Sequence, residues 1–185
     1  MRLFIAAPTS GELKKEIKRY QKTIAHLPLR LTPPENLHIT LVFLGEIPEE
    51  NIPLIEEKIQ TVIKKFLIHN SLFLIPQNFQ PGPDPRRPRL AWLTLKASPS
   101  LLELQKRLAH ALATEEKRPF RVHITVTRFK PNFKLTISDV QKLTKNIGTS
   151  DVNKFETKEL QLMESKLERS GAKYKIVKRF PLMYA

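Results

Sequence analysis

The sequence predicts a mixed α and β fold made of two similar halves that face each other across a cleft. Two observations predict it. An apolar run that contains one His-x-Thr triplet occurs twice, at His38 and at His123. Each run also has the same place in a repeated order of strand, helix, His-x-Thr strand, helix and strand. The copies span residues 1–80 and 89–182, and we expect one domain, residues 1–185, in which a pseudo-twofold axis relates them.

The first copy has two amphipathic helices between its strands. Ser10 is the expected N-cap of a helix of about fifteen residues, and Pro48 opens a helix from 49 to about 66. The first helix is predicted from Leu13, Ile17 and Tyr20 on one face, and the second from isoleucines at helical spacing. The predicted strands are 3–7, 37–45 and 71–79.

The second copy repeats this order and adds one strand. Ser98 caps a helix that reaches about 113, and Ser138 caps one that reaches about 146. The predicted strands are 89–96, 121–129, 157–167 and 173–182, with a turn at 169–172 between the last two.

The segment between the copies, Pro76 to Pro88, has five prolines and one glycine and is predicted to be a hairpin-like loop or a linker. Its arginines Arg86 and Arg87, with Arg89 just beyond it, fit either a nucleic-acid contact or a solvated turn.

The two His-x-Thr triplets place an imidazole and a hydroxyl on the same face of a strand. Side chains alternate across a strand, so His38 and Thr40 point to one side and the apolar residues between them to the other. His123 and Thr125 have the same relation. The apolar faces suit a core, and this leaves both imidazoles facing a common opposite side.

Two histidines in one cleft suit metal-independent phosphodiester chemistry. One imidazole removes a proton from the nucleophile and the other protonates the leaving oxygen, and the ordinary pKa of histidine fits both tasks. Arg128 adds a planar guanidinium for phosphate oxygens, although strict alternation turns it away from His123, so the strand must bend or end there. Phe43, at the matching place in the first copy, could pack near a bound nucleotide or in the core, and we expect the core.

Composition narrows the class of protein. The chain has 32 Lys and Arg against 18 Asp and Glu, a net charge of +14, which favours polyanionic partners such as RNA. It has no cysteine for a disulfide or a thiolate metal site, no phosphate-cradling glycine loop and no stretch for a signal peptide or membrane span. We expect a cytoplasmic protein that needs no metal or other cofactor and does not bind membranes.

The motifs in their order resemble the RNA 2′,3′-cyclic phosphodiesterases, or 2′-5′ RNA ligases, of the two-histidine phosphoesterase superfamily. The resemblance covers nearly the whole chain. It is carried by the segments 1–6, 34–40, 43–46, 119–125, 162–165 and 180–182, together with Arg128.

The resemblance implies an α+β, bilobed fold: two pseudo-symmetric lobes with antiparallel sheets that line a central cleft, and helices outside. It also implies that the protein hydrolyses 2′,3′-cyclic phosphates on RNA or nucleotides to 2′-phosphomonoesters, and we expect a monomer. His38 is then the proton donor and His123 the proton acceptor, while Thr40, Thr125 and Arg128 bind the substrate phosphate and no metal takes part.

Two alternatives stay open. One is a related reaction, either 2′-5′ RNA ligation or cleavage of 2′-5′ oligonucleotides, and the other is a non-catalytic RNA-binding module. The charge along the chain predicts the two protonation states independently of the resemblance. Residues 35–57 carry six acids and no Lys or Arg, which favours a protonated His38, and residues 117–134 carry six basic residues and no acid, which favours a neutral His123.

Overall fold

The computed structural model describes residues 1–66, 72–84, 87–114, 119–130, 136–146, 154–168 and 171–182. Four α-helices and two short 3-10 helices accompany ten strands in this part of the chain. The helices are α1 (Gly11–Ile24), α2 (Ile52–Lys65), α3 (Pro99–Ala111) and α4 (Ile137–Leu143), and the 3-10 helices are Pro34–Asn36 and Glu49–Asn51. The strands are β1 (Arg2–Pro8), β2 (Leu29–Leu31), β3 (His38–Glu46), β4 (Phe73–Gly82), β5 (Leu90–Ala97), β6 (His123–Phe129), β7 (Lys145–Asn146), β8 (Phe155–Glu156), β9 (Glu159–Glu168) and β10 (Gly171–Pro181).

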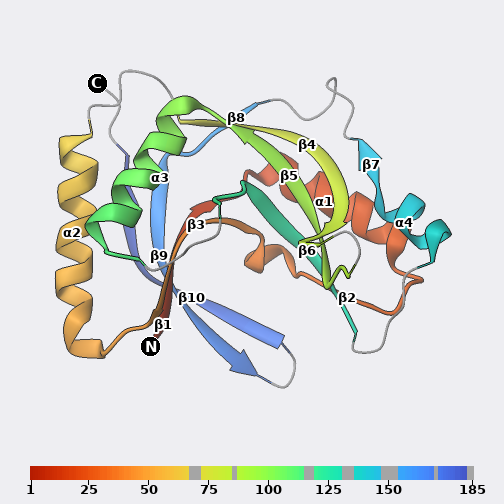
Figure 1. The fold of residues 1–185 in the computed structure, drawn as a ribbon, viewed down its shortest axis with the longest axis horizontal. Coiled ribbons are helices and arrows are strands. Elements are labelled where there is room, and N and C mark those ends of the chain that lie inside the picture. Colours follow the sequence, from red (N-terminus) through yellow and green to blue (C-terminus); the bar gives the residue numbers. More distant parts are fainter. Residues whose placement is uncertain are drawn as a thin grey trace.

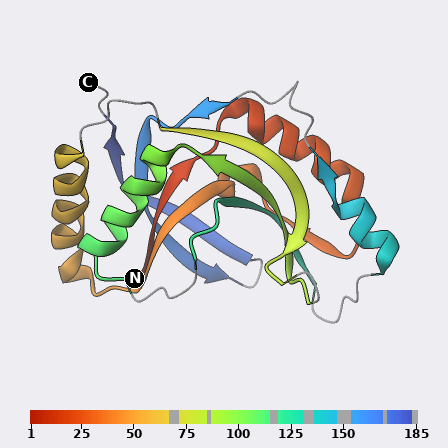
Figure 2. The same cartoon turned by 45° about the horizontal axis from the view of Figure 1, so that its top comes forward.

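All ten strands form one curled antiparallel sheet with the helices outside it. The main order is β10-β9-β1-β3-β6-β5-β4-β7, with β2 beside β6 and β8 beside β4. Figures 1 and 2 show α2 and α3 together at one end of the sheet and α1 and α4 together at the other. The predicted α+β fold, with antiparallel strands inside and helices outside, is confirmed.

The two halves of the sheet meet at a narrow junction between the two His-x-Thr strands. Only Ile39 and Ile124 pair between β3 and β6 in the described structure. Because that pair is antiparallel, its register sets His38 toward Thr125 and His123 toward Thr40. The junction therefore brings both triplets to the centre of the molecule.

Each half of the sheet takes strands from both sequence copies. In the first copy, β1 pairs with β3, but β4 crosses to the other half and pairs with β5. In the second copy, β5 pairs with β6, and β9 crosses back to pair with β1. The helices cross too, since α1 contacts β6 and α3 contacts β3. The copies 1–80 and 89–182 are thus interleaved rather than stacked side by side.

The apolar faces of the helices explain why these elements pack. Ser10 caps α1 by accepting a hydrogen bond from the Leu13 amide, and Leu13, Ile17 and Tyr20 are fully buried, as predicted. The Tyr20 ring stacks on Phe79 of β4 with 3.7 Å between ring centroids. Its hydroxyl donates to the carbonyl of Leu143 at 2.7 Å, which joins α1, β4 and the end of α4.

The prediction of a loop from Pro76 to Pro88 is wrong for the first half of this segment, because β4 continues to Gly82. Proline has no backbone N–H to donate to a neighbouring strand, and it is tolerated at irregular positions of a sheet. The register of β4 against β5 shifts between Pro76 and Phe79, and the carbonyl of Asn78 accepts instead from the Thr94 hydroxyl. Arg86 lies outside the described residues.

The predicted helix from Ser138 to about 146 is wrong at both ends. Helix α4 is capped by Thr136, whose hydroxyl accepts from the amide of Asp139, while the Asp139 carboxylate accepts from the amide of Thr136. This capping box satisfies two otherwise unpaired amides. The Thr-x-x-Asp signal was present in the sequence. The short strands β2, β7 and β8 were not predicted either.

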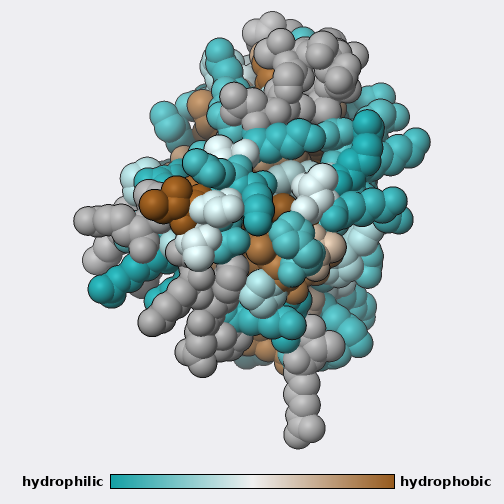
Figure 3. Space-filling view, turned by 90° about the vertical axis from the view of Figure 1, so that its right-hand side faces the viewer, coloured by the Kyte–Doolittle hydropathy of each residue, from teal (hydrophilic) through white to brown (hydrophobic). Residues whose placement is uncertain are grey.

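The face of the molecule that carries α4 is largely polar where its residues are described. Figure 3 shows the side that carries α4, where hydrophilic side chains predominate and apolar ones are few. Such a surface agrees with the net charge of +14. No helix in the described residues combines the length and the apolar character needed to cross a membrane.

Candidate active site

The two His-x-Thr strands have the same local structure. From their histidines onward, β3 and β6 share one order of buried, half-buried and exposed residues over seven positions. Each also has a β-bulge at the position after its threonine. Leu41 is the extra residue of β3, where the register against β1 shifts, and Val126 is the extra residue of β6, where the register against β5 shifts.

The bulge decides which later side chains face the cleft. An extra residue reverses the alternation of the strand, so Thr127 turns into the core and Arg128 turns to the side of His123 and Thr125. The bend that the sequence required at Arg128 is therefore present. Phe43 occupies the same position on β3 and also faces the cleft, with 55% of its surface exposed. The expectation that Phe43 lies in the core is wrong, for the same reason.

Two glutamines on the outer helices hold the bulges. Gln21 of α1 donates from Nε2 to the carbonyl of Val126 at 2.8 Å, and to the carbonyl of Thr32 at 2.8 Å. Gln105 of α3 donates to the carbonyl of Leu41 at 3.2 Å. Each bulge carbonyl thus receives a side-chain amide from the helix that covers it.

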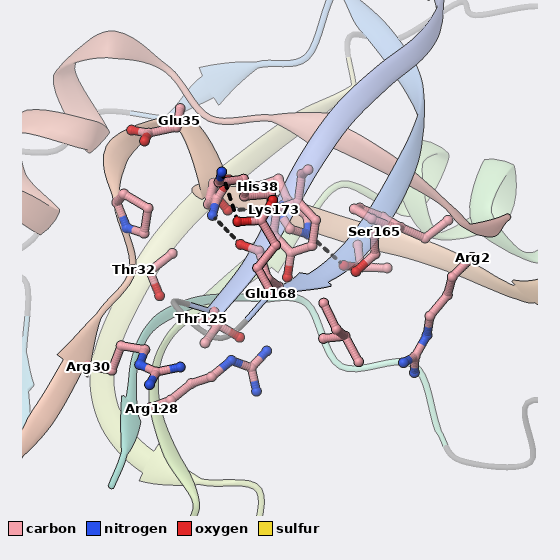
Figure 4. A pocket seen from close by; sticks show the side chains of 18 of the residues that line it. Arg2, Arg30, Thr32, Glu35, His38, Thr125, Arg128, Ser165, Glu168 and Lys173 are labelled. Carbon is pink, nitrogen blue, oxygen red and sulfur yellow. Dashed lines mark hydrogen bonds and ion pairs between the residues drawn. The ribbon is translucent and has the colours of Figure 1, made fainter.

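The cleft is a hollow of about 1010 Å³ at the junction of the two halves. All five residues predicted for the site line it: His38, Thr40, His123, Thr125 and Arg128. Figure 4 shows that the β9–β10 hairpin forms a further wall, with Glu168 and Lys173 extending over the cleft. Sequence reasoning missed this wall, because no local signal indicates that β9 pairs with β1.

Backbone carbonyls fix the tautomer of both imidazoles. His38 donates from Nδ1 to the carbonyl of Asn36 at 2.8 Å, and His123 donates from Nδ1 to the carbonyl of Arg121 at 2.7 Å. A carbonyl only accepts, so each Nδ1 carries a proton and each Nε2 is left for other chemistry. The Nε2 of His38 lies 3.0 Å from the hydroxyl of Thr40.

Aromatic side chains hold both imidazoles in place. The His38 ring lies 4.9 Å from Phe4 and 5.0 Å from Tyr174, which meets it edge-on, and the His123 ring lies 4.4 Å from Trp92. Phe4 and Trp92 come from the first strand of each copy. Trp92 is itself buried.

Burial disfavours the charged form of both imidazoles. Burial lowers the pKa of His38 from its ordinary 6.5 to about 4, although the hydrogen bond to the carbonyl of Asn36 acts in the opposite direction and raises it. Burial also lowers the pKa of His123, and the hydrogen bond to the carbonyl of Arg121 opposes this by raising it. The charges of His123 and Arg128 lower the pKa of His38 further, and those of Arg121 and Arg128 act likewise on His123.

The protonated His38 predicted from charge along the chain is therefore wrong, whereas the lowered pKa of His123 agrees with the neutral ring that was predicted there. That argument made His38 the more easily protonated ring, but His38 has the larger downward shift of pKa. Burial between Phe4 and Tyr174 outweighs the acids nearby in sequence. The charges that act most on His38 are cationic and come from β6.

The described residues contain no group of three or more His, Cys, Asp or Glu placed to hold a metal ion. Apart from its two histidines and Tyr174, the ionisable side chains of the cleft are mostly basic. They are Arg2, Arg30, Arg128 and Lys173, with the two acids Glu35 and Glu168.

Comparison with known proteins assigns the family. The model of the LigT-like phosphoesterases matches residues 6–72. The RNA 2′,3′-cyclic phosphodiesterase of Thermotoga maritima is 31% identical over 137 residues, which are 70% of this chain and 71% of that protein. This chain belongs to the LigT-like phosphoesterases.

Two further comparisons cover nearly the whole chain. The RNA 2′,3′-cyclic phosphodiesterase of Archaeoglobus fulgidus is 28% identical over 185 residues, 97% of this chain and 99% of that protein. A solved structure from Thermus thermophilus has a TM-score of 0.78 at 22% identity and covers 98% of both chains. The chain therefore has the fold of the Thermus thermophilus protein, and the resemblance to the RNA 2′,3′-cyclic phosphodiesterases stated from the motifs is confirmed.

Proposed function

We propose that this protein hydrolyses the 2′,3′-cyclic phosphate at an RNA or nucleotide end to a 2′-phosphomonoester. The observation that carries the proposal is the pair of imidazoles at the junction of β3 and β6, each with Nδ1 bonded to a carbonyl, so that Nε2 is the nitrogen left for proton transfer. Two such groups in one basic cleft are what an in-line displacement at phosphorus requires. The names of the relatives in Thermotoga maritima and Archaeoglobus fulgidus agree with this reaction.

In this mechanism the histidines divide the proton transfers. His123 Nε2 takes a proton from water as the water oxygen bonds to phosphorus. The bond from phosphorus to the 3′ oxygen breaks, and His38 Nε2 gives that oxygen a proton. The product has a 2′-phosphate and a free 3′-hydroxyl. The order of the two roles follows the family resemblance, since the pseudo-symmetric geometry alone permits either.

Thr40, Thr125 and Arg128 bind the non-bridging oxygens of the phosphate. Both hydroxyls lie on the cleft face beside an imidazole, and the guanidinium reaches the same face through the bulge at Val126. These donors stabilise the charge that develops on phosphorus oxygens in the transition state. In the free protein the Thr40 hydroxyl donates to the neutral Nε2 of His38, and it must turn to the phosphate when that nitrogen is protonated.

The test is hydrolysis of a 2′,3′-cyclic mononucleotide, with and without a chelator, by the wild type and by the His38→Ala and His123→Ala variants. We expect turnover that survives the chelator, a 2′-monophosphate product, and a loss of about 10²–10⁴-fold in each variant. A folded variant that keeps near-normal activity would contradict the paired-histidine mechanism. Turnover that the chelator abolishes would indicate a metal-dependent reaction, and binding without turnover would favour an RNA-binding module.

A further inference from the structure

Two arginines of the cleft lie directly opposite each other on neighbouring strands. Arg30 is the middle residue of β2, and the register of β2 against β6 pairs it with Arg128. Both side chains line the cleft, and Figure 4 shows them next to each other below Thr125. Like charges directly opposite in an antiparallel pair destabilise the sheet. Such a pair is expected where the two charges face an anion.

Among the described residues, no acidic side chain forms an ion pair with either Arg30 or Arg128. Of the two acids in the cleft, Glu168 pairs with Lys173 at 2.8 Å, and Glu35 lies on the far side of His38 from the arginines (Figure 4). Both guanidinium groups are thus available to a bound anion.

The position of Arg30 is built into the fold. Thr127 donates from its hydroxyl to the carbonyl of Arg30 at 2.9 Å, and Gln21 ties the carbonyl of Thr32 to that of Val126. The side chain lies against Gly171 at the start of β10, where an added Cβ would be 3.5 Å from Nη1 of Arg30. Strand β2 therefore holds Arg30 between β6 and the β9–β10 hairpin.

The two arginines differ in their electrostatic effect on the imidazoles. The charge of Arg128 lowers the pKa of both His38 and His123, whereas Arg30 is not among the main influences on either. Arg128 also shares the cleft face of β6 with His123 and Thr125, which assigns it to the reacting phosphate. Directly opposite residues of an antiparallel pair are about 5.5 Å apart or less at Cα, and long side chains can diverge further. That reach suits the step from one phosphate to the next along a nucleic acid strand.

We propose that Arg30 binds the phosphodiester that precedes the terminal cyclic phosphate of an RNA strand, while Arg128 binds the cyclic phosphate itself. The protein then recognises the last two phosphates of a chain end, and Arg30 makes it prefer oligonucleotides to mononucleotides. This inference rests on the proposed function, because that function places the cyclic phosphate between the histidines.

The experiment measures kcat/KM on three substrates: a 2′,3′-cyclic mononucleotide, a dinucleotide with a 2′,3′-cyclic end, and the same dinucleotide with an uncharged methylphosphonate linkage. The enzymes are the wild type, Arg30→Ala, Arg30→Gln and the control Arg19→Ala. Arg19 is exposed on α1 and pairs with Glu16, so its loss removes one charge away from the cleft. Thermal unfolding checks each fold, and removal of one of two opposed charges should leave the Tm unchanged or higher.

We expect both Arg30 variants to lose about ten- to a hundredfold on the charged dinucleotide, the usual effect of one charge-assisted phosphate contact. The mononucleotide should change by less than about twofold, and Arg19→Ala should resemble the wild type throughout. The wild type should have a low kcat/KM on the methylphosphonate dinucleotide. The Arg30 variants should have no lower a value, because the uncharged linkage already lacks the contact with Arg30.

Equal losses on the mononucleotide and the dinucleotide would place Arg30 at the reacting phosphate and overturn the inference. An unchanged rate on the charged dinucleotide would overturn it too. Failure of the proposed function is a separate result, namely a wild type that hydrolyses none of the three substrates.

Discussion

At the scale of single residues, the depressed pKa of His38 ties its protonation to the substrate. An imidazole with a pKa near 4 is neutral at neutral pH, yet a proton donor must begin protonated. A bound phosphate anion favours the imidazolium and raises this pKa. Binding of the substrate therefore supplies part of the stabilisation that the acid requires.

This linkage predicts the pH dependence of the reaction. Both histidines have a pKa below 6.5, so kcat/KM, which reports the free enzyme, should be bell-shaped with its maximum below pH 6.5. The maximum of kcat should lie at higher pH, because the bound anion raises both values. Histidine NMR titration with and without a 2′-nucleotide measures the shift directly, with His110 on α3 as an internal control. A free-enzyme His38 that titrates at 6.5 or above would contradict this account.

Phe43 is the second residue whose role depends on the bulges. It stands on β3 where Arg128 stands on β6, and its exposed ring in the cleft suits stacking of a nucleobase. We predict that Phe43→Ala raises KM for a cyclic mononucleotide about fivefold or more and lowers kcat little. The control is Ile137→Ala, which removes an 81% exposed side chain from α4. Equal KM values in the wild type and Phe43→Ala would show that the ring does not contact the base.

At the scale of elements, the sequence predicted the strands and helices whose pattern is local. Apolar periodicity located α1, α2 and α3, and the His-x-Thr runs located β3 and β6. Periodicity could not reveal the bulges at Leu41 and Val126, because a bulge is defined against a partner strand. All five predicted site residues line the cleft. Arg30 and Tyr174 were missed because only pairing between distant segments brings them there, and Phe43 was assigned to the core because the bulge that turns it to the cleft was not foreseen.

The bulge in β6 also gives a prediction about stability. Gln21 is buried and bonds two carbonyls, so Gln21→Met keeps the volume and removes both bonds. We expect unfolding free energy to fall by about 1–3 kcal/mol, and kcat/KM to fall because Arg128 is less firmly placed. Gln105→Met removes one longer bond at the other bulge and should cost less. Urea denaturation and steady-state assays of both variants compare them. A stable, fully active Gln21→Met protein would show that the glutamine does not hold the bulge.

At the scale of the whole molecule, the exchange of strands makes the two copies depend on each other. Strand β4 of the first copy pairs only with strands of the second in the described structure, as does β2. Without its partner, the first copy keeps only the β1–β3 pairing, and the second keeps β5–β6 and β9–β10. Two-stranded units are at best marginally stable in water.

We therefore predict that neither copy folds alone and that the two together restore the active protein. Fragments 1–86 and 87–185 should each lack a cooperative thermal transition by circular dichroism, because each exposes the apolar faces that the other covers. When the two fragments are mixed or co-expressed, they should form a one-to-one complex. This complex should have the cyclic phosphodiesterase activity of the intact chain, which neither fragment can have alone because His38 and His123 lie on different fragments. A fragment that unfolds cooperatively by itself would contradict this, and would mean that the copy it contains is an independent domain. A matched cut within one copy, between residues 66 and 72, controls for the effect of breaking the chain. That cut leaves β1, β3 and α2 on one fragment. The strands β9 and β6, which pair with β1 and β3, stay on the other fragment.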